Sequence, residues 1–204
     1  MLKKLVILIF VLSLFVNSKL CWSDDFDLRY TKWGMTQEEV IKSEEKMDPV
    51  EVTENMVKYK TQIMRNSVEL HFVFVDNKLI GAVYNLEDNY LNSDHFRNTY
   101  TKFKSALIKK YGQPVEERTD WINDTYKNFR NKWGLALSLG HVQYAASWET
   151  PSTTIECSVR EENYYVLCLI EYGSRDYSQL LDEFINEVKP VEINLSETMD
   201  TVES

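Results

Sequence analysis

The sequence has little of what enzymes and nucleic-acid-binding proteins usually carry. It contains no G-x-S-x-G, Walker A or G-x-G-x-x-G motif, so the common signatures of a hydrolase nucleophile and of phosphate binding are absent. Basic residues are also few, because 23 Lys and Arg stand against 32 Asp and Glu, for a formal net charge of −9. An acidic surface repels a phosphate backbone, and no basic stripe with interleaved aromatics is present. We therefore expect no nucleic-acid partner and no cofactor.

Histidine is scarce too. His71, His95 and His141 are the only three, and no two of them have the spacing of a metal-ligand pair. We expect each to be an ordinary surface or partly buried histidine, and we assign no catalytic, cofactor-binding or metal residue. One alternative stays open, an envelope enzyme whose site forms only in three dimensions around His141 or His71. A pocket that brings one of these histidines within hydrogen-bond reach of a carboxylate would favour it.

The one long apolar run is too short for a membrane span. Leu5 to Val16 is apolar except for Ser13, follows Lys3 and Lys4, and is followed by a polar segment. A span of the bilayer core of about 30 Å needs about 20 helical residues. The pattern is typical of a secretory signal peptide. We therefore expect residues 1–23 to be removed, with an earlier cut after residues 16–18 as the alternative, and the mature chain to be periplasmic or secreted, without a membrane span.

The remaining chain predicts the same order of elements twice, a helix followed by three antiparallel strands, in residues 24–90 and 91–174. In the first copy, Thr36 and Glu39 form a capping box for a helix over residues 37–46. Alternating apolar residues between Val57 and Val83 then predict strands with turns at Asn66–Ser67 and Asp76–Asn77. Pairing the strands across both turns places the apolar residues of all three strands on one face of the sheet. The sequence therefore predicts a three-stranded meander with one buried side.

The second copy opens with a longer helix, predicted by an apolar stripe at Phe96, Tyr100, Phe103, Leu107 and Tyr111. Gly112 just after the stripe ends this helix, and Gly140 ends a short helix predicted over residues 133–139. Strands follow between residues 142 and 170. Residues 175–204 read as a C-terminal helix and an acidic, disordered tail. Antiparallel hairpins with segregated helices predict an α+β fold, with meander sheets and the helices packed on one face.

Cys157 and Cys168 flank a predicted hairpin. A turn at Glu162–Asn163 places the two cysteines directly opposite each other, at the Cα separation that a disulfide accepts. In an oxidising compartment such a pair tends to be linked. The alternative is that both are small buried hydrophobic residues on the core face. Either role is structural.

Four aromatic residues lie in the irregular connection between the long helix of the second copy and the strands that follow it: Trp121, Tyr126, Phe129 and Trp133. Aromatic side chains at regular helix or strand spacing are mostly core, but these have no such spacing. We therefore interpret this connection as a candidate surface for binding a partner.

Several short segments resemble a group of small exported bacterial proteins of unknown function. They are K-W-G-M-T-Q-E-E-V, V-D-N-K-L, K-K-Y-G-Q-P, W-G-L-A-L-S-L-G-H and S-W-E-T-P-S-T-T-I, at residues 32–40, 75–79, 109–114, 133–141 and 147–155. The architecture, a helical element and an antiparallel hairpin sheet used twice, is similar to the secreted β-lactamase-inhibitor proteins and to the small lipoprotein of the outer-membrane assembly machine. Those relatives bind other proteins. The chain departs from the lipoprotein at Cys21, which follows Leu20 rather than a small residue.

Export, two sheet-bearing copies and the absence of a catalytic signature together favour a non-catalytic binding protein. Its expected partner is an unknown protein or another component of the bacterial envelope. A small-ligand carrier is a further alternative, for which the helix-facing side of the sheet would need a cavity.

Overall fold

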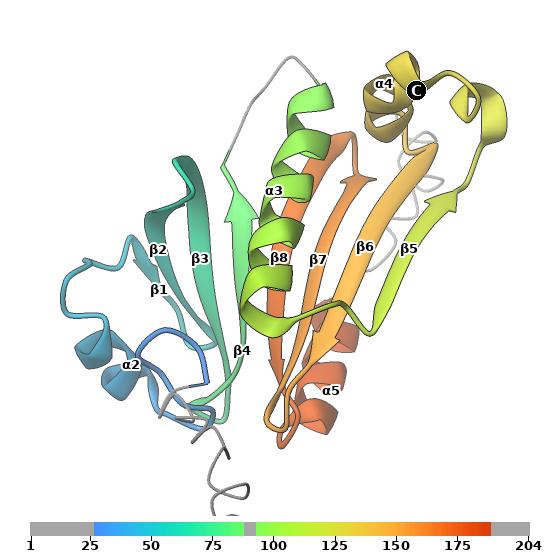
Figure 1. The fold of residues 1–204 in the computed structure, drawn as a ribbon. Coiled ribbons are helices and arrows are strands. Elements are labelled where there is room, and N and C mark those ends of the chain that lie inside the picture. The colour runs from blue at the N-terminus through green and yellow to red at the C-terminus, as the bar shows by residue number, and fades with distance from the viewer. Residues whose placement is uncertain (1–26, 88–92, 189–204) are drawn as a thin grey trace, which may run out of the picture.

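The computed structural model describes residues 27–87 and 93–188, which form one eight-stranded antiparallel sheet with four helices (Figure 1). The strands are β1 (Glu51–Val52), β2 (Met56–Ile63), β3 (Asn66–Val75), β4 (Lys78–Leu86), β5 (Glu116–Trp121), β6 (Val142–Glu149), β7 (Thr153–Glu162) and β8 (Tyr165–Ser174). The helices are α2 (Gln37–Ser43), α3 (Ser93–Tyr111), α4 (Trp133–Ser138) and α5 (Ser178–Val188), with 3₁₀ turns η1 (Asp124–Tyr126) and η2 (Arg130–Lys132). The predicted leader and the acidic tail lie outside the described residues.

Local signals in the sequence set most helix boundaries. The Thr36 and Glu39 capping box is present, with both reciprocal bonds made, and α2 starts at Gln37. Gly112 and Gly140, which follow α3 and α4, have φ of +86° and +66°, the left-handed conformation that glycine adopts without steric cost. The α+β prediction is confirmed, and α2 ends three residues before the predicted boundary.

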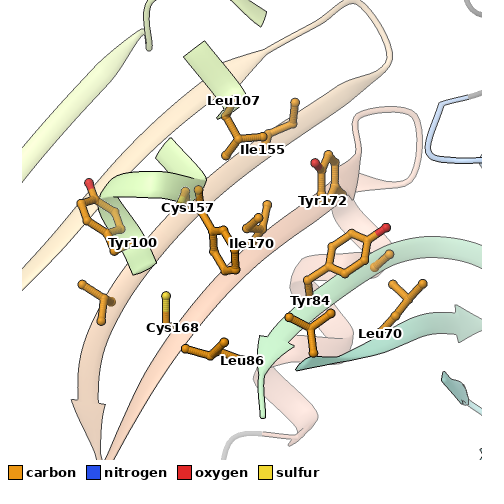
Figure 2. Packing of buried hydrophobic residues seen from close by; sticks show 14 of the residues in the cluster. Leu70, Tyr84, Leu86, Tyr100, Leu107, Ile155, Cys157, Cys168, Ile170 and Tyr172 are labelled. Atoms are coloured by element: carbon orange, nitrogen blue, oxygen red, sulfur yellow. The ribbon is translucent and has the colours of Figure 1, made fainter. Parts of the chain in front are cut away.

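The two halves of the chain share one sheet. Its strand order is β1-β2-β3-β4-β8-β7-β6-β5, so the halves meet where β4 pairs with β8. Helix α3 lies across β7 and β8, while α2 lies beside the β1–β2 edge of the sheet and adds Val40 to the core (Figure 1). The core between these helices and the sheet is continuous, and Phe72, Phe103 and Trp148 are among its largest buried side chains. Figure 2 shows how Tyr100 and Leu107 of α3 reach Cys157 and Ile155 on the sheet.

Helix α5 corrects the expectation that all helices pack on one face. It lies behind the sheet in Figure 1, on the face opposite α3, and contacts β3, β4 and β8. Gly81 and Gly173 are cross-strand partners there, and a Cβ on Gly173 would lie 2.8 Å from Leu181 Cδ2. Two facing residues without side chains therefore make the room that α5 occupies.

The predicted pairing of β2, β3 and β4 depends on where their turns lie. The turn at Asp76–Asn77 is confirmed, with Phe74 opposite Leu79, but a β-bulge between Val73 and Phe74 then pairs Phe72 with Ala82 instead of Gly81. The first turn is at Met64–Arg65 rather than Asn66–Ser67. Asn66 Nδ2 instead donates to the carbonyls of Ile63 and Met64 and supports the turn from its flank. Because this register shift is even, the predicted buried residues of β2 and β3 keep their face. The bulge instead moves Gly81 and Val83 of β4, which were predicted to be buried on the core face, to the face that α5 occupies.

The predicted opposition of Cys157 and Cys168 is wrong. The hairpin turns at Asn163–Tyr164, one residue later than predicted, so Cys157 pairs with Ile170 and Cys168 with Val159. Both cysteines are free and fully buried on the core face (Figure 2). Burial raises the pKa of the Cys168 thiol to about 12 and that of Cys157 further, so both stay protonated at neutral pH. They act as small buried hydrophobic residues, the alternative that the sequence left open.

Candidate functional site

The connection between β5 and β6 folds into a compact lobe at one end of the sheet, labelled by α4 in Figure 1. Asn123 starts η1, and its Oδ1 accepts a hydrogen bond from the backbone N–H of Thr125 at 2.9 Å. Trp133 Nε1 donates to the carbonyl of Lys127 at 3.0 Å and closes the loop between η1 and α4. A Cβ on Gly134 would lie 2.6 Å from Asp94 Oδ1, so α4 approaches the start of α3 closely. The lobe is thus ordered by its own contacts and anchored on α3.

Three of the four predicted partner-surface aromatics form the base of this lobe. The rings of Trp121 and Trp133 meet edge to face with centroids 5.8 Å apart, and Tyr126 stacks on His141 at 5.6 Å. The guanidinium carbons of Arg97 and Arg130 lie 5.7 and 5.9 Å from the Trp133 ring centroid, within cation–π range. Trp121, Tyr126 and Trp133 are therefore scaffold, only partly exposed.

The fourth aromatic, Phe129, points outward with 58% of its surface exposed. Other exposed hydrophobic residues lie in the same region. Half of the twelve exposed large hydrophobic residues in the described chain lie in this lobe or at the β7–β8 turn. These six residues are Ile122, Phe129, Leu135, Leu139, Tyr164 and Tyr165. A Cβ on Gly140 would lie 2.8 Å from the Glu161 carboxylate, so the lobe and the β7–β8 turn meet. We call these six residues the apolar end.

The lobe carries net positive charge in an acidic protein, while the β7–β8 turn beside it carries Glu161 and Glu162. Residues 121–141 contain Lys127, Arg130 and Lys132 against Asp124, a local formal charge of +2 in a chain of −9. Only Lys127 forms an ion pair within the lobe, with Asp124 at 3.1 Å. Exposed apolar side chains with a charged rim are the arrangement of protein interfaces.

Sequence reasoning found Phe129 but missed the other five residues of the apolar end. A signal was present for α4, because its sequence W-G-L-A-L-S has apolar residues all around the helix. Only one side of so short a helix can face the core: Gly134, Ala136 and Leu137 are buried, whereas Leu135 is exposed. A six-residue helix of that composition must expose some leucine. Tyr164 and Tyr165 were hidden by the misplaced turn, because Tyr164 occupies the tip with 99% of its surface exposed.

The histidines lie on three separate elements. His71 Nε2 is 3.3 Å from Glu69 Oε2 on β3, and burial is the main cause that lowers the His71 pKa, so the ring is neutral at pH 7. His95 Nε2 lies 3.2 Å from Thr99 Oγ1 within α3, and His141 stacks on Tyr126. Among the described residues no group of three or more His, Cys, Asp and Glu is arranged to hold a metal ion.

Two hollows of the structure lie beside α5, and a third lies beside α3. One of about 610 Å³ lies between α5 and the β3–β4 turn, lined largely by polar residues such as Gln37 and Asn77. Another of about 510 Å³ lies between α5 and the open face of the sheet. The helix-facing side, where a small-ligand carrier would need its cavity, is filled by the core except for the third hollow, of about 380 Å³, which lies between α3 and strands β5 and β6. Neither His71 nor Glu69 lines any of these three hollows.

Comparisons with protein-family models, with curated proteins and with solved structures find no match to this chain. The resemblance to small exported bacterial proteins therefore stays a prediction. Within residues 27–87 and 93–188, no helix is both long and apolar enough to cross a bilayer.

Proposed function

We propose that this chain is an exported, non-catalytic protein of the bacterial envelope or secreted space, and that it binds another protein through the apolar end. The observation that carries the proposal is the gathering of six exposed large hydrophobic residues on two segments that meet. Monomeric soluble proteins rarely gather exposed apolar side chains in this way without a partner. Phe129 and the tyrosines supply large contact area, and ordered aromatics beneath them reduce the entropy lost on binding.

The order of elements supports two related halves. Helix α2 precedes β1 to β4, α3 precedes β5 to β8, and the strands run inward from opposite edges of the sheet in the order 1-2-3-4 and 5-6-7-8. We infer that the halves are two copies of one plan with four strands each, one more than the sequence analysis expected. The lobe between β5 and β6 is the main insertion in the second copy, and inserted loops on a rigid scaffold commonly carry binding function.

Export predicts a processed N-terminus. In the native host we expect the chain to be recovered from the envelope or the medium with residues 1–23 removed, because the basic, apolar and polar regions of that segment match a cleaved leader. Intact-mass measurement with N-terminal peptide mapping checks this. Recovery of the uncleaved chain in the cytoplasmic fraction would contradict it.

Partner binding is tested by capture from the native cell envelope with the mature protein as bait. We expect one protein to be retained reproducibly after a salt wash, and the double variant Ile122→Lys and Phe129→Lys to retain at least ten-fold less. Truncating or charging apolar residues at the centre of an interface costs more than about 1.4 kcal/mol, which is a factor of ten.

The matched control is the double variant Val52→Lys and Val115→Lys. Val115 and Ile122 flank the two ends of β5 and expose similar fractions, 66% and 70%, so the control adds the same charge to equally exposed apolar sites. Equal retention by wild type and both double variants would place the interface elsewhere. Equal loss from both double variants would indicate a charge effect and contradict the proposal.

A further inference from the structure

A groove on the face of the sheet behind α3 has features of a second binding site, separate from the apolar end. Helix α5 forms one wall with Leu181, Phe184 and Ile185, and the floor crosses from β4 through β8 and β7 to β6. Its volume of about 510 Å³ lies within the range of small-molecule pockets. Ile185 exposes 47% of its surface, so the apolar wall is open to solvent.

Two carboxylates face each other in the floor of this groove. Glu156 on β7 and Glu171 on β8 are direct cross-strand partners, and their side chains share the face that α5 occupies. Like charges in directly opposed positions of a sheet repel each other. Burial is the main cause that raises the pKa of Glu171, with Glu156 adding to the rise and Arg160 opposing it. Two acidic side chains therefore lie side by side in a partly exposed floor.

Each carboxylate of this pair has a long ion pair with one arginine. Arg118 Nη2 lies 3.6 Å from Glu156 Oε2 and Arg160 Nη1 lies 3.9 Å from Glu171 Oε2, both beyond hydrogen-bond distance. Both guanidiniums also serve other acids, because Arg118 lies 3.5 Å from Asp120 and Arg160 donates to Glu162 at 3.3 Å.

A third carboxylate, that of Glu149 at the rim of the groove, does form a close hydrogen-bonded ion pair. Glu149 accepts a hydrogen bond from Arg175 Nη1 at 3.0 Å. Glu156 and Glu171 lack such a bond and stand beside an apolar wall, so the groove is complementary to a molecule with one cationic and one apolar part.

We propose that this groove binds a small amphiphilic cation, with its ammonium or guanidinium group between Glu156 and Glu171 and its apolar body against Leu181, Phe184 and Ile185. Charge-assisted hydrogen bonds to the two carboxylates would fix the head group, and burial of the apolar body would supply the larger part of the affinity. The groove and the apolar end share no residue, so this proposal does not depend on partner binding at the apolar end.

A series of three probes with the same chain length separates charge from apolar burial. We expect n-octylammonium to bind the mature protein at least ten-fold more tightly than n-octanol, and n-octanoate to bind more weakly than both, as measured by calorimetry. Bound n-octylammonium should also raise the thermal midpoint in a concentration-dependent way, since a ligand that binds only the folded state stabilises it. Equal affinities for the ammonium and the alcohol, or no binding of the ammonium, would overturn the proposal.

The residue assignment is tested with the double variant Glu156→Gln and Glu171→Gln. We expect its affinity for n-octylammonium to fall at least ten-fold while its affinity for n-octanol is unchanged. Glu38→Gln with Glu45→Gln, two exposed residues near α2, makes the same change in net charge and should bind like wild type. A similar loss in this control would show attraction by overall charge and overturn the assignment.

Discussion

Arg29→Met is expected to lower the free energy of unfolding by about 3–5 kcal/mol, because it leaves the Glu44 carboxylate buried without its counter-charge. Arg29 Nε and Nη2 donate to the two Glu44 oxygens at 2.7 and 2.8 Å, and the Glu44 side chain is only 2% exposed. This bidentate pair fastens the segment before α2 to the end of that helix. Urea denaturation monitored by fluorescence measures the loss.

The double variant Arg29→Met and Glu44→Met makes this prediction specific. Removing both charges removes the unpaired buried carboxylate, so the double variant should be clearly more stable than Arg29→Met alone. Arg175→Met is the control, since its pair with Glu149 is about half exposed and such pairs contribute at most about 1 kcal/mol. A double variant no more stable than Arg29→Met would show that the side-chain packing of Arg29, and not its charge, carries the effect.

Trp148→Ala is expected to cost about 3–5 kcal/mol in the same measurement. Trp148 on β6 is 2% exposed and is the largest fully buried side chain of the described core. Its loss leaves a cavity between β6 and α3 and also leaves the Gly112 carbonyl without the 2.9 Å hydrogen bond that Trp148 Nε1 donates. The bond ties the sheet to the residue that ends α3.

Trp148→Phe separates the two contributions. It keeps most of the packing and loses the hydrogen bond, so we expect a smaller loss of about 1–3 kcal/mol. Val115→Ala, at a site 66% exposed, should change stability by no more than about 0.5 kcal/mol. A Trp148→Ala protein with wild-type stability would contradict the position given to β6 in the core.

The parts of the fold that the sequence predicted are those with strong local signals. The capping box at Thr36, the helical stripe from Phe96 to Tyr111 and the glycines at 112 and 140 each act over a few residues and survive folding unchanged. The faces of β2, β3, β7 and β8 were also predictable, because alternation depends only on parity and an even register shift preserves it. The face of β4 was not, because the bulge between Val73 and Phe74 turns Gly81 and Val83 to the opposite side.

Features that depend on distant contacts were not predictable. Strand β5, with the sequence E-E-R-T-D-W, is an edge strand exposed over most of its length, so it carries no apolar alternation. Two hairpins turn at Met64–Arg65 and Asn163–Tyr164, where three of the four residues are unusual in the left-handed conformation. The face chosen by α5 depends on Gly81 meeting Gly173 across two strands far apart in sequence.

In the candidate site, too, the local grouping of residues was predictable from the sequence, whereas their orientation was not. The sequence placed Trp121, Tyr126, Phe129 and Trp133 in one connection, and the structure gathers them in one lobe. Which of them face inward depends on Arg97 from α3 and on His141, the residue before β6, which no local pattern reveals. The share of Tyr164 and Tyr165 in the apolar end likewise depends on the contact between the β7–β8 turn and Gly140.

Site-specific photo-crosslinking in the native host tests whether Phe129 contacts a partner protein. A photoreactive phenylalanine analogue at Phe129 should give one crosslinked protein species from the envelope, and the same analogue at Val52, 52% exposed on the far edge strand, should give none. We expect the Phe129 product to disappear when Ile122→Lys is added. Crosslinking from Val52 but not from Phe129, or a Phe129 product unaffected by Ile122→Lys, would contradict it.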